Sequence, residues 1–301
     1  MKPYATYLWR YLSLFFIPVL TLCCSSCNKE LLERPWAQID LPSHSYRSDN
    51  LWAAGIGAKV YLGNESNSGQ YSQFFVEYDI FENTFTDLPT NEEVCACGYS
   101  SYFITHNANL YYIANEAVEY IPSQNKWTGF SSTYNDPYRR GEAGVAAVDD
   151  EIFLVGGRNN LNTLVRYDFF NDTWSLGPDF PYYTSYSAAV GYNGKLYVFS
   201  GSGEGTKKVS VFNPDTDQWK ALNDAPSDIT DRCYAVAFNS TIYLTTSDKI
   251  FIYDPATDSW GQKYGLPKVY YKPIPVVCDD GIYLAGFNDD SNELVLYKFL
   301  K

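Results

Sequence analysis

The sequence predicts an all-β protein, a six-bladed β-propeller whose four-stranded blades form a ring closed by the N-terminal strand. Three observations lead to this prediction. Aromatic residues make up 18% of the 301 residues, with 28 Tyr and 7 Trp against a single Met, and aromatic side chains fit the pleated surface of a strand. A strand-turn-strand pattern recurs along the chain. The two chain ends each carry part of one further repeat.

The first 26 residues are expected to be a targeting signal and not part of the fold. Lys2 and Arg10 supply positive charge, and the apolar run at residues 12–22 is too short to span a bilayer as a helix. Two small residues then precede Cys27. This arrangement resembles a bacterial lipoprotein signal peptide, which implies that Cys27 is acylated and begins the mature chain. A cleaved secretory signal and an uncleaved anchor are the alternatives.

Residues 27–35 would then form a tether. Asn28-Lys29-Glu30 after the cysteine resembles lipoproteins of the Bacteroidetes. The resemblance implies an outer-membrane lipoprotein, periplasmic or surface-exposed, that is held to the membrane by its lipid anchor. Cys23 or Cys24 could compete with Cys27 as the acceptor of the lipid.

The main repeat signal is an aromatic residue followed seven residues later by Trp or Phe, with a polar turn between them. Pro, Asn and Asp in that turn, as in residues 213–217, set the geometry that joins two antiparallel strands. Each occurrence therefore marks the third and fourth strands of one unit. The five pairs are Tyr78 and Phe85, Tyr120 and Trp127, Tyr167 and Trp174, Phe212 and Trp219, and Tyr253 and Trp260.

Each unit also carries an aliphatic residue followed by an aromatic one, which opens a second, apolar strand. A hairpin signal such as Asn193-Gly194 precedes five of these dipeptides, and Gly57-Ala58-Lys59 takes its place in the first unit. Each unit is therefore predicted to contain four short strands. The six dipeptides are Val60-Tyr61, Leu110-Tyr111, Ile152-Phe153, Leu196-Tyr197, Ile242-Tyr243 and Ile282-Tyr283.

These landmarks resemble the kelch repeat, and the resemblance covers essentially all of residues 36–301. The third unit, residues 128–174, matches best, with Gly156-Gly157, Tyr167-Asp168 and Trp174 in place, whereas the double glycine is altered in the other units. The WD40 repeat is the main rival, but it expects a Gly-His pair in each blade. Neither histidine of this chain follows a glycine.

The two chain ends account for the sixth blade. The last unit stops at residues 297–301 without its Trp strand, and residues 36–42 are an orphan strand of that type that begins at Trp36. Pairing between them would close the ring and cover two open sheet edges. Residues 36–301 are thus expected to form one domain, because each blade buries its faces only against its neighbours.

Cysteine usage predicts no metal site and no cofactor. Cys95, Cys97, Cys233 and Cys278 are expected to be buried free thiols, although export would allow disulfides whose pairing stays open. Cys95-Ala96-Cys97 does not have zinc spacing, and the chain has only 2 His. The copper radical oxidases share this fold but need two His and a Tyr linked to a Cys, a set that this chain is not expected to assemble.

The candidate site lies where the innermost strands begin, on the face that carries the long loops. Binding residues usually occupy such loops above a rigid scaffold. Aromatic rings there could stack on sugars while Arg and carboxylate groups bind hydroxyls, although the same residues could cap carbonyls and pack between blades. The candidate ligand-binding residues are Arg47, Arg140, Glu142, Arg158, Tyr183, Tyr186, Arg232, Tyr271 and Lys272, among which Glu142, Tyr186, Arg232 and Lys272 stand eleven residues before a second-strand aromatic.

The sequence therefore predicts a membrane-anchored binding module for a glycan or a protein partner. A net charge of −13 argues against nucleic acid, because a phosphate backbone requires clustered Lys and Arg. The alternative is a sugar-directed enzyme. Kelch-fold sialic-acid (N-acetylneuraminate) mutarotases suggest Glu142 as acid or base and Arg232 as anion clamp. No catalytic residue is assigned, since no motif supports that transfer.

Overall fold

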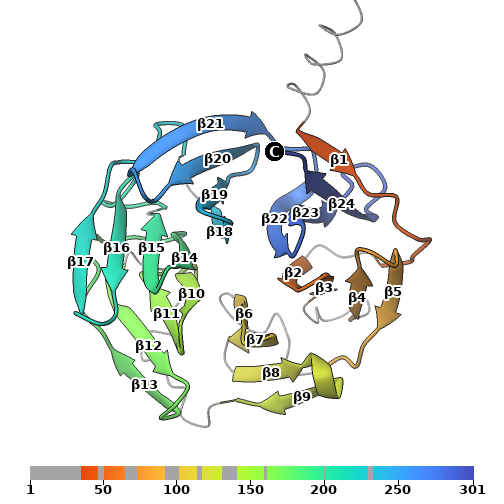
Figure 1. The fold of residues 1–301 in the computed structure, drawn as a ribbon, viewed down its shortest axis with the longest axis horizontal. Helices are drawn as coiled ribbons and strands as arrows, with labels where there is room; N and C mark the ends of the chain where they lie inside the picture. The colour runs from red at the N-terminus through yellow and green to blue at the C-terminus, as the bar shows by residue number, and fades with distance from the viewer. Residues whose placement is uncertain are drawn as a thin grey trace, which may run out of the picture. The chain divides into compact units, whose positions relative to one another are not determined.

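The computed structural model describes residues 35–46, 51–64, 73–91, 102–113, 117–130, 141–158, 161–199, 201–229 and 233–301, apart from the side chains of residues 270–272. Trp36–Lys301 form one compact unit. Within it, six four-stranded antiparallel sheets are arranged in a ring (Figure 1). The predicted six-bladed β-propeller is confirmed.

Three blades come from the first half of the unit. Blade 1 consists of β2 (Leu51–Ile56), β3 (Lys59–Asn64), β4 (Phe75–Asp79) and β5 (Thr84–Asp87). Blade 2 consists of β6 (Tyr102–His106), β7 (Asn109–Ile113), β8 (Ala117–Ile121), the 3-10 turn η1 (Pro122–Gln124) and β9 (Lys126–Gly129). Blade 3 consists of β10 (Gly144–Val148), β11 (Glu151–Val155), β12 (Leu164–Asp168) and β13 (Thr173–Leu176).

The second half supplies the other three. Blade 4 consists of β14 (Ala188–Tyr192), β15 (Lys195–Phe199), β16 (Val209–Asn213) and β17 (Gln218–Ala221). Blade 5 consists of β18 (Tyr234–Phe238), β19 (Thr241–Thr245), β20 (Lys249–Asp254) and β21 (Ser259–Gly265). Blade 6 consists of β22 (Tyr270–Cys278), β23 (Gly281–Phe287), β24 (Leu294–Phe299) and β1 (Trp36–Gln38).

Blade 6 closes the ring with strands from both ends of the unit. Strand β1 pairs antiparallel with β24, so that Trp36 lies opposite Phe299, and the Ile39 N–H donates to the Leu296 carbonyl at 2.9 Å. The Trp36 indole also donates to the Gly265 carbonyl of blade 5 at 2.9 Å. The predicted closure by the N-terminal strand is confirmed.

The seven-residue spacing has a geometric cause. The two aromatic residues of each pair lie directly opposite each other on the third and fourth strands of their blade. Tyr167 faces Trp174, and the other four predicted pairs face each other in the same way. The turn between them places an Asn or Asp in the left-handed region, which these residues tolerate. In four blades the buried tyrosine donates to that side chain: Tyr78 to Asn83, Tyr120 to Asn125, Tyr167 to Asp172 and Tyr253 to Asp258, at 2.7–3.0 Å.

The core is divided among the contacts between neighbouring blades. Phe153 of blade 3 packs on Phe212 of blade 4, with ring centroids 5.8 Å apart. Tyr111 of blade 2 lies in one cluster with Tyr167 of blade 3. Because no blade covers its own faces, the blades stabilise one another as a single cooperative ring.

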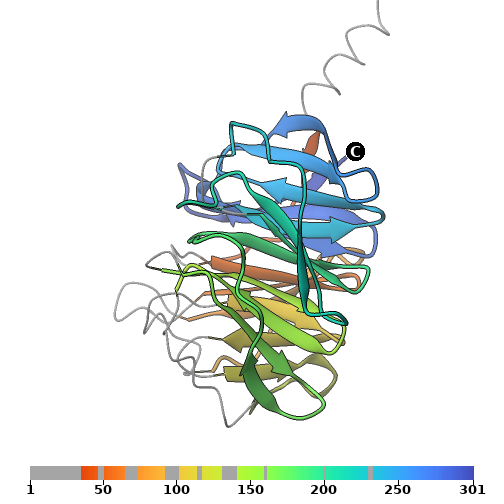
Figure 2. The same cartoon turned by 90° about the vertical axis from the view of Figure 1, so that its left-hand side faces the viewer.

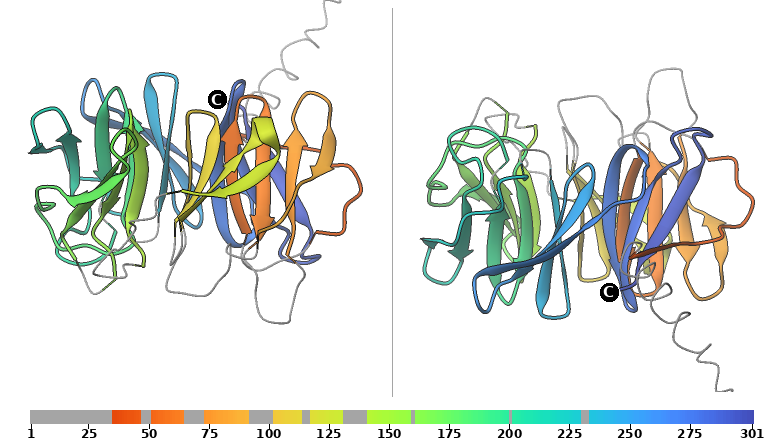
Figure 3. Two further views of the ribbon diagram at one scale, coloured as in Figure 1. Left: turned by 90° about the horizontal axis from the view of Figure 1, so that it is seen from below. Right: turned by 90° about the horizontal axis from the view of Figure 1, so that it is seen from above.

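The strands run between two faces of the ring (Figures 2 and 3). The turn face carries the connections between first and second and between third and fourth strands, such as residues 149–150 and 169–172. The loop face carries the other connections, such as residues 156–163 and 177–187. Trp36 and the C-terminus both lie at the turn face, because Trp36 pairs with Phe299. In the parts of the chain that the structure describes, no helix has the length and apolarity needed to cross a membrane.

Candidate functional site

A central cavity of about 870 Å³ runs along the axis and is lined by residues of all six innermost strands. Its wall is mostly small and aliphatic, as at Ala53, Val145 and Ala147. Two glycines let neighbouring inner strands approach closely. A Cβ at Gly191 would lie 2.1 Å from the Ala147 carbonyl oxygen, and one at Gly55 would meet blade 6 in the same way. The side chains along the channel are therefore mostly small and apolar, and the charged side chains among the described lining residues, Glu142 and Arg158, lie near one end.

Three polar side chains meet at the loop-face end of this channel. The Tyr186 hydroxyl donates to Glu142 Oε1 at 2.5 Å, and Arg158 Nη2 donates to the same oxygen at 3.1 Å. Glu142 comes just before β10, Arg158 just after β11, and Tyr186 just before β14. The cluster therefore joins blades 3 and 4 at the channel mouth.

The backbone at this cluster adopts an unusual conformation. Glu142 and Tyr186 have φ angles of 64° and 57°, a left-handed conformation that costs an ordinary residue about 1–2 kcal/mol. Backbone hydrogen bonds compensate for it, since the Tyr186 N–H donates to the Glu142 carbonyl at 2.7 Å and the Arg158 N–H to the Gly141 carbonyl at 2.6 Å. Strained non-glycine residues often accompany functional sites.

The loops around the cluster are tied together by a short backbone ladder. Gly157 donates to the Thr184 carbonyl at 3.0 Å, and Thr184 donates to the Leu161 carbonyl at 3.0 Å. Ser185 and Ser202 exchange two backbone hydrogen bonds of 3.1 and 2.8 Å. Three loops of blades 3 and 4 are thus held in register, which preorganises the side chains that they carry.

The cluster combines a carboxylate, a guanidinium and a phenol. The Glu142 side chain is only 13% exposed, whereas that of Arg158 is 43% exposed, so the cation is the more accessible group. Glu142 holds the guanidinium in place and is itself held by Tyr186. The planar fork of the guanidinium suits carboxylates and vicinal hydroxyls. The arrangement can bind an anionic or hydroxyl-rich ligand.

The structure brings together Glu142, Arg158 and Tyr186 from the predicted set. Tyr183 is 50% exposed and is not among the residues that line the channel. Tyr271 and Lys272 lie on β22, but their side chains are outside the part that the structure describes. The whole of each of the other four predicted residues also lies outside it: Arg47, Arg140, Arg232 and the lipidation candidate Cys27.

The predicted free thiols are confirmed for two cysteines. Cys233 and Cys278 are free and buried, and burial raises the pKa of the Cys278 thiol to about 12. Cys95 and Cys97 fall outside the described residues. Among the described residues, no group of three or more His, Cys, Asp and Glu side chains could hold a metal ion.

Sequence reasoning missed two tyrosines of the channel mouth. The Tyr102 hydroxyl accepts a hydrogen bond from the Ala143 N–H at 2.8 Å, which ties blade 2 to the backbone beside Glu142. Tyr234 lines the channel in blade 5 and is 37% exposed. Both stand nine residues before a second-strand aromatic. Counting nine residues back from each of these aromatics, as well as eleven, would therefore have found them.

Comparison with known proteins agrees with this geometry. The Kelch motif matches residues 139–181 and 183–226, which include the strands of blades 3 and 4. Kelch-like protein 35 of Mus musculus is 33% identical over 178 residues, covering 56% of this chain and 30% of that protein. Kelch-like protein 25 of Xenopus tropicalis is 25% identical over 252 residues, covering 74% and 41%. The matches thus span less than half the length of these relatives.

A solved structure, described as the structure of YjhT, has a TM-score of 0.54 and 17% identity, and the match covers 66% of this chain and 75% of that one. At this identity the likeness concerns the fold alone. The recurring motif, the relatives and the ring of six four-stranded sheets agree with one another. The chain is a six-bladed kelch-repeat β-propeller.

Proposed function

We propose that this propeller is a binding module that takes a glycan or a protein partner at the loop-face mouth of its channel. The observation that carries the proposal is the convergence of Glu142, Arg158 and Tyr186 there, with two left-handed residues held by neighbouring backbone. Arg158 is the primary contact for a carboxylate or hydroxyl of the ligand. Tyr186 and Glu142 orient it.

We propose that this module belongs to an outer-membrane lipoprotein, periplasmic or surface-exposed. The proposal rests on the resemblance of the first residues to lipoprotein signals, with Cys27 as the lipidated residue. The propeller itself begins at Trp36, on the turn face.

Ligand binding by the full chain tests the site. A glycan array and a panel of acidic peptides would be screened first. Arg158→Ala should then weaken any ligand found by about tenfold to a hundredfold, because a hydrogen bond to a charged group contributes about 1.5–3 kcal/mol. Lys208→Ala removes a basic group that is paired with Asp224 and is absent from the channel lining, so it should bind normally. An equal loss of ligand affinity in both variants, or no loss in either, would contradict the assignment of this site.

A sugar-directed enzyme is the second candidate. The observation in its favour is the partly buried Glu142 carboxylate, which is held between a phenol and a guanidinium. The test is mutarotation of N-acetylneuraminate, followed by NMR with wild type and Glu142→Gln. Acceleration by wild type alone would make the protein a mutarotase. No acceleration, together with ligand binding, would leave the binding module.

The anchor has its own test. Cells that express the full chain would be fed a labelled fatty acid, and Cys27→Ser should abolish both labelling and recovery in the membrane fraction. Labelling that persists in Cys27→Ser would assign the lipid to Cys23 or Cys24. A wild-type chain that takes up no label would overturn the lipoprotein proposal and leave the binding site untouched.

A further inference from the structure

Tyr183 is exposed on the loop that leads to the candidate site. This loop runs from β13, the outermost strand of blade 3, to β14, the innermost strand of blade 4, and it reaches Tyr186 three residues after Tyr183. Tyr183 is 50% exposed, whereas the preceding Tyr182 packs edge-on against the buried Phe180, with ring centroids 5.6 Å apart. The Tyr183 ring is therefore displayed on the loop face, beside the channel mouth.

The backbone that carries Tyr183 is fixed by its neighbours. The Tyr183 carbonyl accepts from the Gly205 N–H at 3.3 Å, and the next residue, Thr184, has no exposed surface. The loop of blade 4 packs so closely here that a Cβ at Gly201 would lie 2.4 Å from the Ser185 carbonyl oxygen. The position of Tyr183 is thus set before a ligand binds, which lowers the entropic cost of binding.

Tyr183 also lies close to Arg158. The Gly157 N–H donates to the Thr184 carbonyl at 3.0 Å, and these two residues are the chain neighbours of Arg158 and Tyr183. Adding the bond lengths along this path puts the Cα atoms of Arg158 and Tyr183 at most about 15 Å apart. The two side chains can therefore contact neighbouring units of one extended ligand.

The fold does not require an exposed ring at this position. Tyr183 stands fourteen residues before the second-strand aromatic Tyr197, and the same count back from Tyr243 in blade 5 gives Ile229, which is 2% exposed. An aliphatic residue that packs inward thus occupies the position in another blade. A half-exposed tyrosine beside a ligand-binding group is instead typical of a contact surface.

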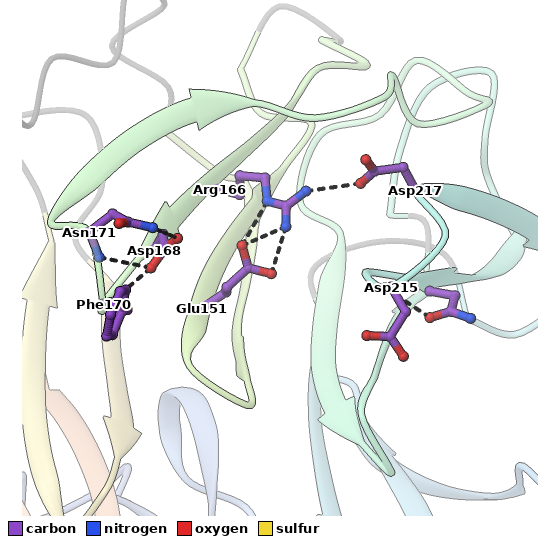
Figure 4. Close-up of polar contacts among 8 residues, drawn as sticks. Glu151, Arg166, Asp168, Phe170, Asn171, Asp215 and Asp217 are labelled. Carbon is purple, nitrogen blue, oxygen red and sulfur yellow. Dashed lines mark hydrogen bonds and ion pairs between the residues drawn. The ribbon is translucent and has the colours of Figure 1, made fainter.

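Arg158 differs in the same way from an arginine that stabilises the fold. Arg166 of blade 3 donates to both carboxylate oxygens of Glu151 and to Asp217 of blade 4 (Figure 4), and its side chain is 22% exposed. The Arg158 side chain is 43% exposed and lines the channel. A guanidinium and a phenol ring are therefore both accessible where blades 3 and 4 meet on the loop face.

We propose that the ligand is an acidic oligosaccharide that spans two subsites. The carboxylate of one sugar binds the Arg158 guanidinium through parallel hydrogen bonds, and the next sugar stacks on the Tyr183 ring, whose apolar face and polar tip match the C–H face and hydroxyl rim of a sugar. This inference rests on the proposed function, because it extends the same site from the channel mouth onto the loop. A monosaccharide occupies only one of the two subsites.

Calorimetric titration of the full chain with galacturonate and digalacturonate tests the two subsites. Wild type should bind digalacturonate about two- to tenfold more tightly than galacturonate, the size of an aromatic stacking contact. Tyr183→Ser should remove this difference by weakening digalacturonate alone, and its unchanged affinity for galacturonate would show that the variant is folded. Tyr183→Trp should keep the difference, since the indole ring also stacks.

Phe170→Ser is the matched control, because it removes a ring that is 92% exposed on the outer turn of blade 3, at the turn face (Figure 4). It should bind both ligands as wild type does, and Arg158→Ala should weaken both. If Arg158→Ala weakens both ligands and Tyr183→Ser weakens neither, the Tyr183 subsite is wrong and the site at the mouth stands. Unchanged affinity in Arg158→Ala would contradict the mouth site itself.

The chemical class of the ligand has its own outcomes. Neutral galactobiose should bind more weakly than digalacturonate, because it lacks the carboxylate that Arg158 binds. Failure of both galacturonates to bind, or equal affinity for galactobiose and digalacturonate, would overturn the acidic oligosaccharide. An acidic peptide that binds in place of the galacturonates and is weakened by Tyr183→Ser would assign the same surface to a protein partner and also overturn it.

Discussion

The two faces of the propeller are built on different principles. On the turn face one contact recurs, since a buried tyrosine donates to the left-handed Asn or Asp of the following turn in four blades. On the loop face, the contacts of Glu142, Arg158 and Tyr186 lie at the junction of blades 3 and 4, while the side chains at the equivalent positions Arg232 and Lys272 are outside the part that the structure describes. A contact that every blade repeats serves the fold. The loop-face contact instead includes two non-glycine residues in the left-handed conformation, a feature that often accompanies functional sites.

The largest expected effect comes from the outer edge of blade 6, where β1 closes the ring. Deleting residues 36–42 removes the ladder between β1 and β24 and the Trp36 ring, whose centroid lies 4.9 Å from that of Phe299. We expect a loss of more than about 3 kcal/mol in the free energy of unfolding, measured in urea, because losing a packed tryptophan alone costs a comparable amount. Deleting residues 300–301, the exposed tail beyond β24, is the control. Equal stability of the two deletions would contradict closure by β1.

The repeated tyrosine contact predicts a smaller effect. Tyr253→Phe removes the hydroxyl that donates a hydrogen bond to Asp258 at 2.8 Å. The free energy of unfolding, measured in urea, should fall by about 1 kcal/mol. Blade 4 has Phe212 at the equivalent position, and its turn residue Asp217 accepts from Arg166 instead. Phe212→Tyr should therefore gain much less than Tyr253→Phe loses. A gain of the same size would show that Asp217 was still available and that the arginine contact is unimportant.

A pH dependence is expected at the junction of blades 2 and 3. Burial lowers the pKa of His106 below 6.5, against the opposing charges of Asp150, 3.6 Å from Nε2, and Glu119. The folded state thus disfavours the protonated ring more than the unfolded chain does. Its contribution to stability is complete above pH about 6.5 and is lost as the pH falls through the lowered folded value.

Comparing the melting temperatures of wild type and His106→Gln separates the contribution of His106 from that of the other titrating groups. The advantage of wild type over the variant should be larger at pH 7.5 than at pH 5.5. Asp150→Asn, which removes a charge that favours the protonated ring, should make the acid loss of wild-type His106 steeper. A difference between wild type and His106→Gln that does not change with pH would refute the assignment.

Repetition also decides how much could be predicted from the sequence. The pairing of Tyr167 with Trp174, and of Trp36 with the last strand, followed from spacings that recur along the chain, because each recurrence tests the same local geometry. No repeated spacing in the sequence indicated the contact between Arg158 and Glu142. Counting by repeat phase placed Glu142 and Tyr186 at the channel mouth, but their left-handed backbone depends on hydrogen bonds between loops of different blades, and no local pattern encodes those.

The smallest expected effect on stability, and the sharpest contrast between the faces, comes from Glu142→Gln. The amide oxygen can still accept from Tyr186, the backbone is unchanged, and the lost ion pair involves an arginine that is 43% exposed, where such pairs contribute at most about 1 kcal/mol. The free energy of unfolding, measured in urea, should therefore change by less than about 1 kcal/mol.

Ligand affinity should fall by about tenfold or more in Glu142→Gln, because the carboxylate that holds the Arg158 guanidinium is gone. Glu119→Gln makes the same change at a carboxylate that accepts from Tyr111 and Asn109 of blade 2, and should leave binding intact. If Glu142→Gln lost stability and kept its ligand, the loop-face cluster would be part of the fold, and the difference between the two faces would disappear.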